Sequence, residues 1–84
     1  MSNAGKTVEV KAAMSGIFYR RASPDDPAYA EVGDSVKKKQ VLALLETMKV
    51  FQKVKSPAAG TIEAILIENE TPVTDGTVLM VIKS

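Results

Sequence analysis

The chain contains a degenerate internal repeat. Gly16-Ile17-Phe18 resembles Gly60-Thr61-Ile62, and Val36 followed five residues later by Val41-Leu42 resembles Val73 followed five residues later by Val78-Leu79. The first match has an offset of 44 residues and the second an offset of 37, so the first copy carries 44 − 37 = 7 additional residues between Gly16 and Val36. A repeat of this kind indicates a fold built from two related halves.

Both halves have the composition of β-strands. Clusters of β-branched residues between turn signals predict strands at residues 7–11, 16–20, 41–46, 50–55, 61–67 and 78–82. Segment 59–68 also has the Ala and Leu content of a helix, but Gly60 and the β-branched residues after it favour a strand. We therefore expect an all-β fold, a flattened antiparallel β-barrel or sandwich with quasi-two-fold related halves.

The additional residues of the first half lie in a polar segment. Two prolines and two adjacent aspartates fall within residues 21–28. Because these residues cannot continue a central strand, they favour a turn or a protruding loop. We expect these 7 additional residues to form a projection on the first half, with no equivalent on the second.

The tetrapeptide Glu46-Thr47-Met48-Lys49 lies between an apolar run at 41–45 and an alternating run at 50–54. This placement predicts that Lys49 is at the tip of the hairpin joining the two halves, at one end of the molecule. Turn lysines are common because charge keeps a loop solvated. An amine held away from the core on a fixed turn is also suited to carry a covalent arm that visits other proteins. Met48 has little core to fill there and is a candidate contact for a modifying enzyme.

Composition excludes several classes of site. The 84 residues suffice for one small domain at 6–84, after a polar segment 1–5 that is expected to be a disordered tag or linker remnant. Cys and His are both absent, so we expect no disulfide, no metal site and no autonomous catalysis. The net charge is +1, which predicts no nucleic-acid partner. No apolar stretch has the roughly 18 residues of a membrane span, so we expect no membrane contact and a cytoplasmic protein.

Other notable residues have simpler interpretations. Lys37-Lys38-Lys39 lacks interleaved aromatic residues and is typical of a solvated turn. The adjacent carboxylates of Asp25 and Asp26 are expected to face solvent and not to catalyse. Three glycines are expected to need positive φ, and they are Gly33, Gly60 and Gly76. Core or barrel-end packing is expected for the aromatic residues, which are Phe18, Tyr19, Tyr29 and Phe51.

Over about residues 8–83 the chain resembles the biotin carboxyl carrier proteins, the biotinyl-domain subunits of acetyl-CoA carboxylase and its relatives. Members of that family carry Glu-Ala-Met-Lys-Met or a near variant at the hairpin of a flattened β-barrel (a barrel-sandwich hybrid), and the lysine forms an amide with biotin. The corresponding residues here are Glu46, Thr47, Met48, Lys49 and Val50. Thr47 replaces the usual Ala and Val50 the usual second Met, and both differences bear on the efficiency of the biotin ligase.

The resemblance extends to the inserted loop. Gly16-Ile17-Phe18-Tyr19-Arg20, followed by Ser23-Pro24-Asp25, is similar to the start of the protruding "thumb" of the acetyl-CoA carboxylase type of carrier. The turns at residues 31–34 and 55–61 also match the family. In that family the thumb can lie against the bound biotin, and Tyr19 and Tyr29 are further candidates for contact with the biotin ring. The thumb residues so implied are Arg20, Arg21, Ala22, Ser23, Pro24, Asp25, Asp26, Pro27 and Ala28.

The resemblance implies a non-catalytic carrier. A biotin protein ligase would acylate Lys49, and the domain would move carboxybiotin from biotin carboxylase to a carboxyltransferase that forms malonyl-CoA for fatty acid synthesis. A homodimer within a larger complex is compatible with this role. Two alternatives stay open. One is a lipoyl carrier of a 2-oxo acid dehydrogenase, although lipoyl domains place Asp where Met48 stands. The other is an unmodified barrel-sandwich adaptor.

Overall fold

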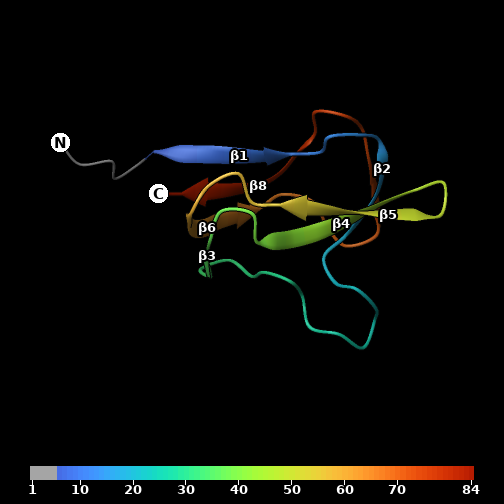
Figure 1. Cartoon of the computed structure of the whole chain (residues 1–84), viewed down its shortest axis with the longest axis horizontal. Coiled ribbons are helices and arrows are strands. Elements are labelled where there is room, and N and C mark those ends of the chain that lie inside the picture. The colour runs from blue at the N-terminus through green and yellow to red at the C-terminus, as the bar shows by residue number, and fades with distance from the viewer. Residues whose placement is uncertain (1–5) are drawn as a thin grey trace.

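A computed structural model of the chain describes residues 6–84, and the expected tag or linker remnant at 1–5 lies outside them (Figure 1). The described part contains strands and no helix. It therefore has no helix capable of crossing a membrane. The all-β prediction is confirmed. The strands are β1 (Thr7–Lys11), β2 (Gly16–Tyr19), β3 (Ser35–Val36), β4 (Val41–Thr47), β5 (Val50–Lys55), β6 (Gly60–Ile65), β7 (Thr71–Val73) and β8 (Val78–Lys83).

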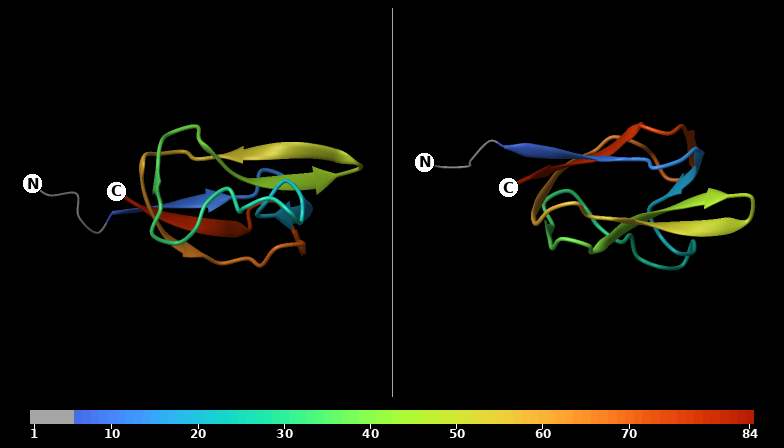
Figure 2. Two further views of the ribbon diagram at one scale, coloured as in Figure 1. Left: turned by 90° about the horizontal axis from the view of Figure 1, so that it is seen from below. Right: turned by 45° about the horizontal axis from the view of Figure 1, so that its top comes forward.

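The strands form two antiparallel sheets that face each other. One sheet has the order β1-β8-β6-β3 and the other the order β5-β4-β2-β7. Figure 2 shows the two layers and the β4–β5 hairpin projecting from one end, opposite the end where the chain finishes at β8. The two orders are equivalent when β1, β8, β6 and β3 are matched with β5, β4, β2 and β7. This equivalence is the quasi-two-fold relation predicted from the repeat.

The two halves exchange their short strands. The first half supplies β3, which pairs with β6 of the second half. The second half supplies β7, which pairs with β2 of the first half. Neither half can therefore complete its sheet alone, and the repeat has to fold as one unit.

The repeat extends to individual backbone hydrogen bonds. A bond in one half has a counterpart in the other when the residue numbers are shifted by 44 or 37. Glu70 N–H donates to Phe18 O at 2.6 Å, and Gly33 N–H donates to Ile62 O at 2.8 Å. Three further pairs of bonds are matched, and backbone N–H is the donor in each. The bond from Gly76 to Ala12 O corresponds to that from Lys39 to Ser56 O, and the bond from Ala12 to Thr77 O corresponds to that from Ser56 to Gln40 O. The bond from Thr77 to Thr74 O corresponds to that from Gln40 to Lys37 O.

The glycine prediction is correct at two positions and wrong at the third. Gly33 and Gly76 have φ of 95° and 92°, as expected. Gly60 does not have positive φ; it is needed because a Cβ there would lie 2.6 Å from the Lys83 carbonyl oxygen. The same holds for its counterpart Gly16, where a Cβ would lie 2.6 Å from the Glu46 carbonyl oxygen. Both glycines thus allow two strands to approach closely.

An aliphatic core fills the space between the sheets, as the composition predicted. Phe18 is fully buried, and it is the one aromatic residue of this core cluster. Of the two predicted kinds of packing, core or barrel-end, core packing does not apply to Phe51, whose side chain is 54% exposed on the edge strand β5 and contacts the Tyr19 ring. The buried cluster consists of Val10, Ala12, Phe18, Ala30, Val36, Leu42, Ala43, Leu45, Ile62, Val73, Leu79, Met80 and Ile82.

Candidate functional site

The hairpin between β4 and β5 is closed by a two-residue turn made of Met48 and Lys49. Thr47 pairs with Val50 across its base, and the pairing continues down the two strands. Met48 and Lys49 have φ of 50° and 67°. Two positive values in succession are typical of a type I′ turn, whose twist matches that of the strands. The backbone therefore holds Lys49 at the tip of a well-defined hairpin, as predicted.

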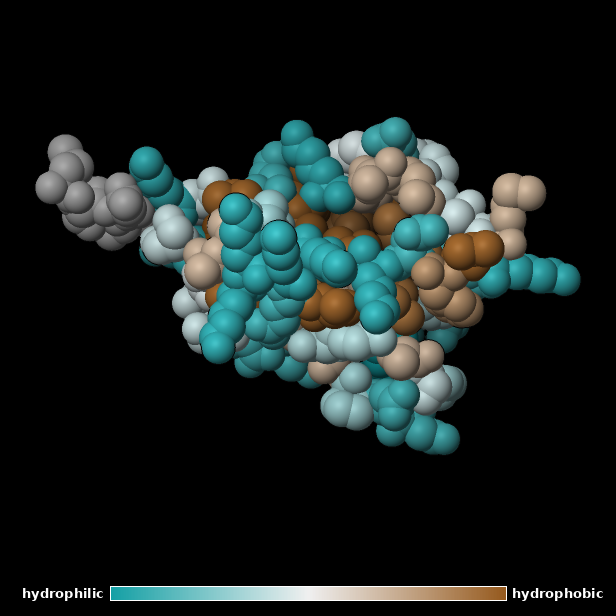
Figure 3. Space-filling model, viewed as in Figure 1, coloured by the Kyte–Doolittle hydropathy of each residue, from teal (hydrophilic) through white to brown (hydrophobic). Residues whose placement is uncertain are grey.

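Apolar side chains surround the lysine at this tip. Met48 is 93% exposed, and Val50 and Phe51 are 52% and 54% exposed. Lys49 itself is exposed. Figure 3 shows apolar side chains gathered at the hairpin end of the molecule, next to an extended polar side chain. Exposed apolar groups in a cluster commonly mark a surface that contacts another protein. The tip therefore combines an accessible amine with a recognition surface.

The predicted site residue Glu46 has a structural partner on β2. The Tyr19 hydroxyl donates a hydrogen bond of 2.8 Å to Glu46 Oε1. This hydrogen bond, with desolvation and the negative charges of Glu46 and Glu70, raises the pKa of Tyr19 above its ordinary value of 10.0. The Tyr19 ring also contacts the Phe51 ring, with centroids 5.9 Å apart. Tyr19 thus supports the hairpin from the neighbouring strand.

The predicted thumb is a loop with a fixed base. Tyr29 N–H donates to Arg20 O at 2.8 Å, which closes the loop where it leaves and rejoins the barrel. The Arg20 guanidinium donates to Ala30 O at 3.1 Å and to Glu31 Oε1 at 2.9 Å. Arg20 N–H donates to Asn69 Oδ1 at 2.8 Å. Arg20 is therefore part of the anchor and not of the projecting loop.

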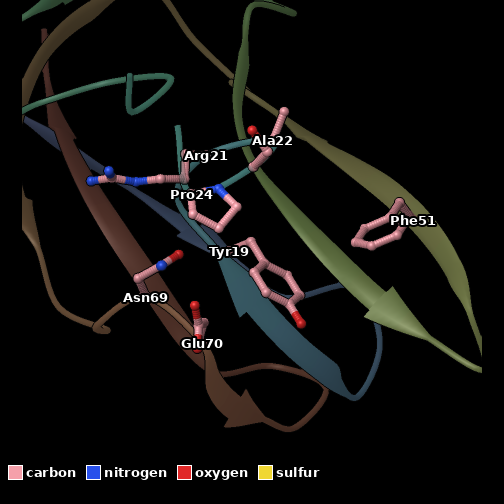
Figure 4. Close-up of a pocket in the computed structure, with 8 residues that line it drawn as sticks. Tyr19, Arg21, Ala22, Pro24, Phe51, Asn69 and Glu70 are labelled. Carbon is pink, nitrogen blue, oxygen red and sulfur yellow. The ribbon is translucent and has the colours of Figure 1, made fainter. Parts of the chain in front are cut away.

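A shallow cavity of about 140 Å³ lies between the thumb and the hairpin (Figure 4). Tyr19 and Phe51 form one wall, with Pro24 and Ala22 of the thumb beside them in the same view. The other lining residues are Arg21, Ser23, Asn69 and Glu70. The cavity therefore has an aromatic side and a polar side. Among the described residues, Nε of Arg20 and Nε of Arg21 are buried without a hydrogen-bond partner.

The structure brings together some of the predicted thumb contacts and separates others. Tyr19 lines the cavity, whereas Tyr29 is not among its lining residues. Asp25, Asp26 and Pro27 are exposed and also lie outside the lining, as does the half-buried Ala28. Sequence reasoning missed Asn69 and Glu70, which precede β7. Their one signal was the repeat, which places this turn beside β2.

The comparison with known families agrees with this geometry. A family model described as "Biotin-requiring enzyme" matches residues 8–82, nearly the whole described part of the chain. The chain belongs to this family. The resemblance inferred from the hairpin motif, the repeat and the turns is thereby confirmed.

Several curated relatives in the biotin-requiring family are similar to this chain. The biotin carboxyl carrier protein of acetyl-CoA carboxylase from Pseudomonas aeruginosa is 47% identical over 64 residues, which cover 76% of this chain and 41% of that protein. The protein of the same name from Streptococcus pyogenes is 43% identical over 74 residues, covering 88% and 45%. A chloroplastic protein of this type from Arabidopsis thaliana is 40% identical over 74 residues, covering 88% and 26%. The chain spans less than half the length of these relatives.

Two solved structures share the fold. A single-chain, multi-domain long-chain acyl-CoA carboxylase superposes with a TM-score of 0.79 at 19% identity, over 99% of this chain and 8% of that one. The urea carboxylase of Kluyveromyces lactis superposes with a TM-score of 0.77 at 23% identity, over 98% and 7%. At these identities the likeness concerns the fold, and it confirms the predicted barrel-sandwich architecture.

Proposed function

We propose that this chain is the biotin-carrying domain of a biotin-dependent carboxylase, with biotin joined through an amide to Nζ of Lys49. The position of Lys49 carries the proposal, because the described structure places this amine at the tip of a two-residue turn, exposed to solvent. Membership of the biotin-requiring family supports it. So does the name of the similar proteins, biotin carboxyl carrier protein of acetyl-CoA carboxylase.

The domain acts as a carrier and leaves the chemistry to its partners. Bound biotin supplies a ring nitrogen that takes up CO2 in one active site and releases it in another. The hairpin holds the attachment atom outside the core, and the long lysine side chain gives the group its reach. Tethering keeps the effective concentration of the group high at each active site. We infer partners of three kinds: a biotin protein ligase, a biotin carboxylase and a carboxyltransferase, with acetyl-CoA as the acceptor. A cytoplasmic location and a homodimer within the larger complex stay predictions.

Intact-mass measurement tests the attachment site. After co-expression with a biotin protein ligase and excess biotin, the wild-type chain should gain the mass of one biotin less one water. Lys49→Arg should gain nothing, because arginine keeps the charge but cannot be acylated in this way. Lys53→Arg, on strand β5 of the same hairpin, is the matched control and should be modified like wild type. An adduct on Lys49→Arg, or a mass increase that matches lipoate, would overturn the assignment.

We further propose that the biotin ring rests in the cavity between the thumb and the hairpin when the domain is between partners. The lining fits such a group, because Tyr19 and Phe51 offer an aromatic surface and Asn69 offers an amide on the polar side. The thumb would then restrain the arm.

Exchange of residues 21–28 for Asn-Gly tests this second proposal. The base already has the Tyr29 N–H to Arg20 O hydrogen bond of 2.8 Å, which a two-residue hairpin turn preserves. The exchange should leave the fold intact and change the free energy of unfolding by no more than about 1 kcal/mol, since no strand is removed. NMR relaxation of biotin on Lys49 should show faster motion than in wild type. Unchanged motion would mean that the thumb does not hold the ring.

A further inference from the structure

The methionine beside the attachment lysine differs sharply from the other methionines that the structure describes. Met48 is 93% exposed, at the tip of the β4–β5 hairpin. Met80 is 1% exposed within the core, and Met14 is half-buried and packed against the core. Met1 lies outside the described residues. Access to the thioether sulfur is one of the main factors that decide how fast a methionine is oxidised.

We propose that Met48 is a site of reversible oxidation to methionine sulfoxide, and that the sulfoxide slows the acylation of Lys49. The first half of this proposal depends on the exposure of one sulfur. The second half rests on the proposed function, because it concerns recognition by the biotin ligase. Together they make the hairpin tip a redox-sensitive control on loading of the carrier.

Hydrogen peroxide is a sufficient oxidant for the step. The Met48 sulfur lone pair attacks one peroxide oxygen, and the O–O bond breaks. The departing hydroxide takes the hydrogen of the transferred oxygen and leaves as one water. The sulfur is oxidised by two electrons and the peroxide is reduced by two. A methionine sulfoxide reductase with a thiol reductant reverses the change.

The surroundings of Met48 explain why oxidation should alter recognition. Val50 and Phe51, 52% and 54% exposed, extend the apolar surface of the tip on the other side of Lys49. An enzyme that closes over Lys49 has to cover this surface. A sulfoxide places a polar, strongly hydrated oxygen there, and covering it without a hydrogen-bond partner is unfavourable. Acylation of the neighbouring amine should therefore become slower.

The same exposure predicts that the fold is unaffected. Met48 does not belong to the buried cluster or to the half-buried side chains packed on it. A sulfoxide at this position remains in water, so no buried contact is lost. The melting temperature of the oxidised chain should equal that of the reduced chain. An effect on loading then cannot be attributed to unfolding.

Peptide mapping after graded peroxide treatment tests the first half. Met48 should gain one oxygen at least about ten times faster than Met80, and clearly faster than Met14, because their thioethers are shielded to different degrees. The folded chain is used throughout, with Met1 followed on its own peptide. Oxidation of Met14 or Met80 at the rate of Met48 would overturn the assignment of this site.

A ligase assay tests the second half. Oxidised wild type should be biotinylated with a kcat/KM about tenfold below that of the reduced chain, and reductase treatment should restore it. Each chain is compared with itself before and after peroxide, so the starting rate of a variant does not matter. Met48→Leu should show a ratio near one, whereas Met14→Leu should keep the full loss. Equal rates for oxidised and reduced wild type would overturn the control. Absence of biotinylation in the reduced chain would overturn the proposed function, while the mapping result would stand on its own.

Discussion

The two halves of this barrel use the same backbone for different purposes. In both, a glycine at the start of the second strand, β2 or β6, allows close approach to the last strand, at Gly16 with Glu46 and at Gly60 with Lys83. The last strand of the first half continues through a turn into β5, whereas β8 ends beside β1, with Ser84 N–H donating to Lys6 O at 3.1 Å. One half therefore ends in a connected hairpin and the other in an open pair of strands.

The difference shows which parts of the chain are scaffold and which carry function. The repeated elements are the sheets, the matched hydrogen bonds and the core. The parts without a counterpart are the Met48-Lys49 turn and the thumb, and the candidate site consists of these two parts, the strands beneath them and the Asn69-Glu70 turn. Duplication supplies the support, and departures from the duplicate supply the site.

The largest effect is expected when a methyl group is added at the two glycines where strands approach closely. Gly16→Ala and Gly60→Ala should each lower the free energy of unfolding by about 3 kcal/mol, because a Cβ would lie 2.6 Å from a carbonyl oxygen in both. Urea denaturation measures this. Gly33→Ala is the control: no atom lies within 4 Å of its Cβ position, and the left-handed φ alone should cost about 1 kcal/mol. A cost at Gly16 no greater than at Gly33 would contradict the steric explanation.

A smaller effect of opposite sign should appear at the matched turns. At these matched turns each half has two residues with positive φ, which are Gly33 and Lys39 in the first half and Glu70 and Gly76 in the second. Lys39→Gly and Glu70→Gly should each raise the free energy of unfolding by about 1 kcal/mol, because glycine adopts this φ without strain.

Lys38→Gly is the control for these substitutions, since Lys38 is not among the residues with positive φ. It should lower the free energy of unfolding in the same urea experiment, because glycine adds freedom to the unfolded chain. If Lys39→Gly and Lys38→Gly had the same sign, backbone strain would not distinguish the turns.

The smallest effect concerns the hydrogen bond between Tyr19 and Glu46, which supports the hairpin of the first half. The hydrogen bond to Glu46 raises the pKa of Tyr19 above 10.0. The protonated hydroxyl is thus favoured in the folded state, so its contribution to stability is present below pH 10 and is lost as the pH rises through the raised pKa. In a Tyr29→Phe background, ultraviolet titration should follow Tyr19 alone, since the chain has two tyrosines. Adding Glu46→Ala should return the pKa toward 10.0, and an unchanged pKa would exclude the hydrogen bond as its cause.

Much of the fold could be predicted because the repeat and the β-branched clusters are visible in the sequence itself. The predicted strand at 16–20 ends at Tyr19, and the one at 61–67 occupies Gly60–Ile65. Two strands were missed, β3 and β7, because they have only two and three residues and so give too short a pattern to recognise. Pro72 fits in β7 because this strand is at the edge of its sheet, where a missing N–H is tolerated.

The candidate site was predictable to the extent that it follows the chain. Lys49 and its neighbours are consecutive, so the hairpin motif located them together. The cavity instead combines the thumb with Phe51 on β5 and Asn69 before β7, which approach only through strand pairing. The Tyr19 to Glu46 hydrogen bond, between residues 27 positions apart, depends in the same way on the register of β2 against β4. Composition and motifs do not contain that register.

The Met48-Lys49 turn has a consequence for any attempt to engineer this protein. Asn-Gly is the usual pair for such a bend, so a search for thermostable variants would select it here first. That replacement would remove both the acceptor amine and its apolar neighbour. A screen that rewards robustness alone would therefore erase the part of the chain that other enzymes must read, and an activity selection has to accompany it.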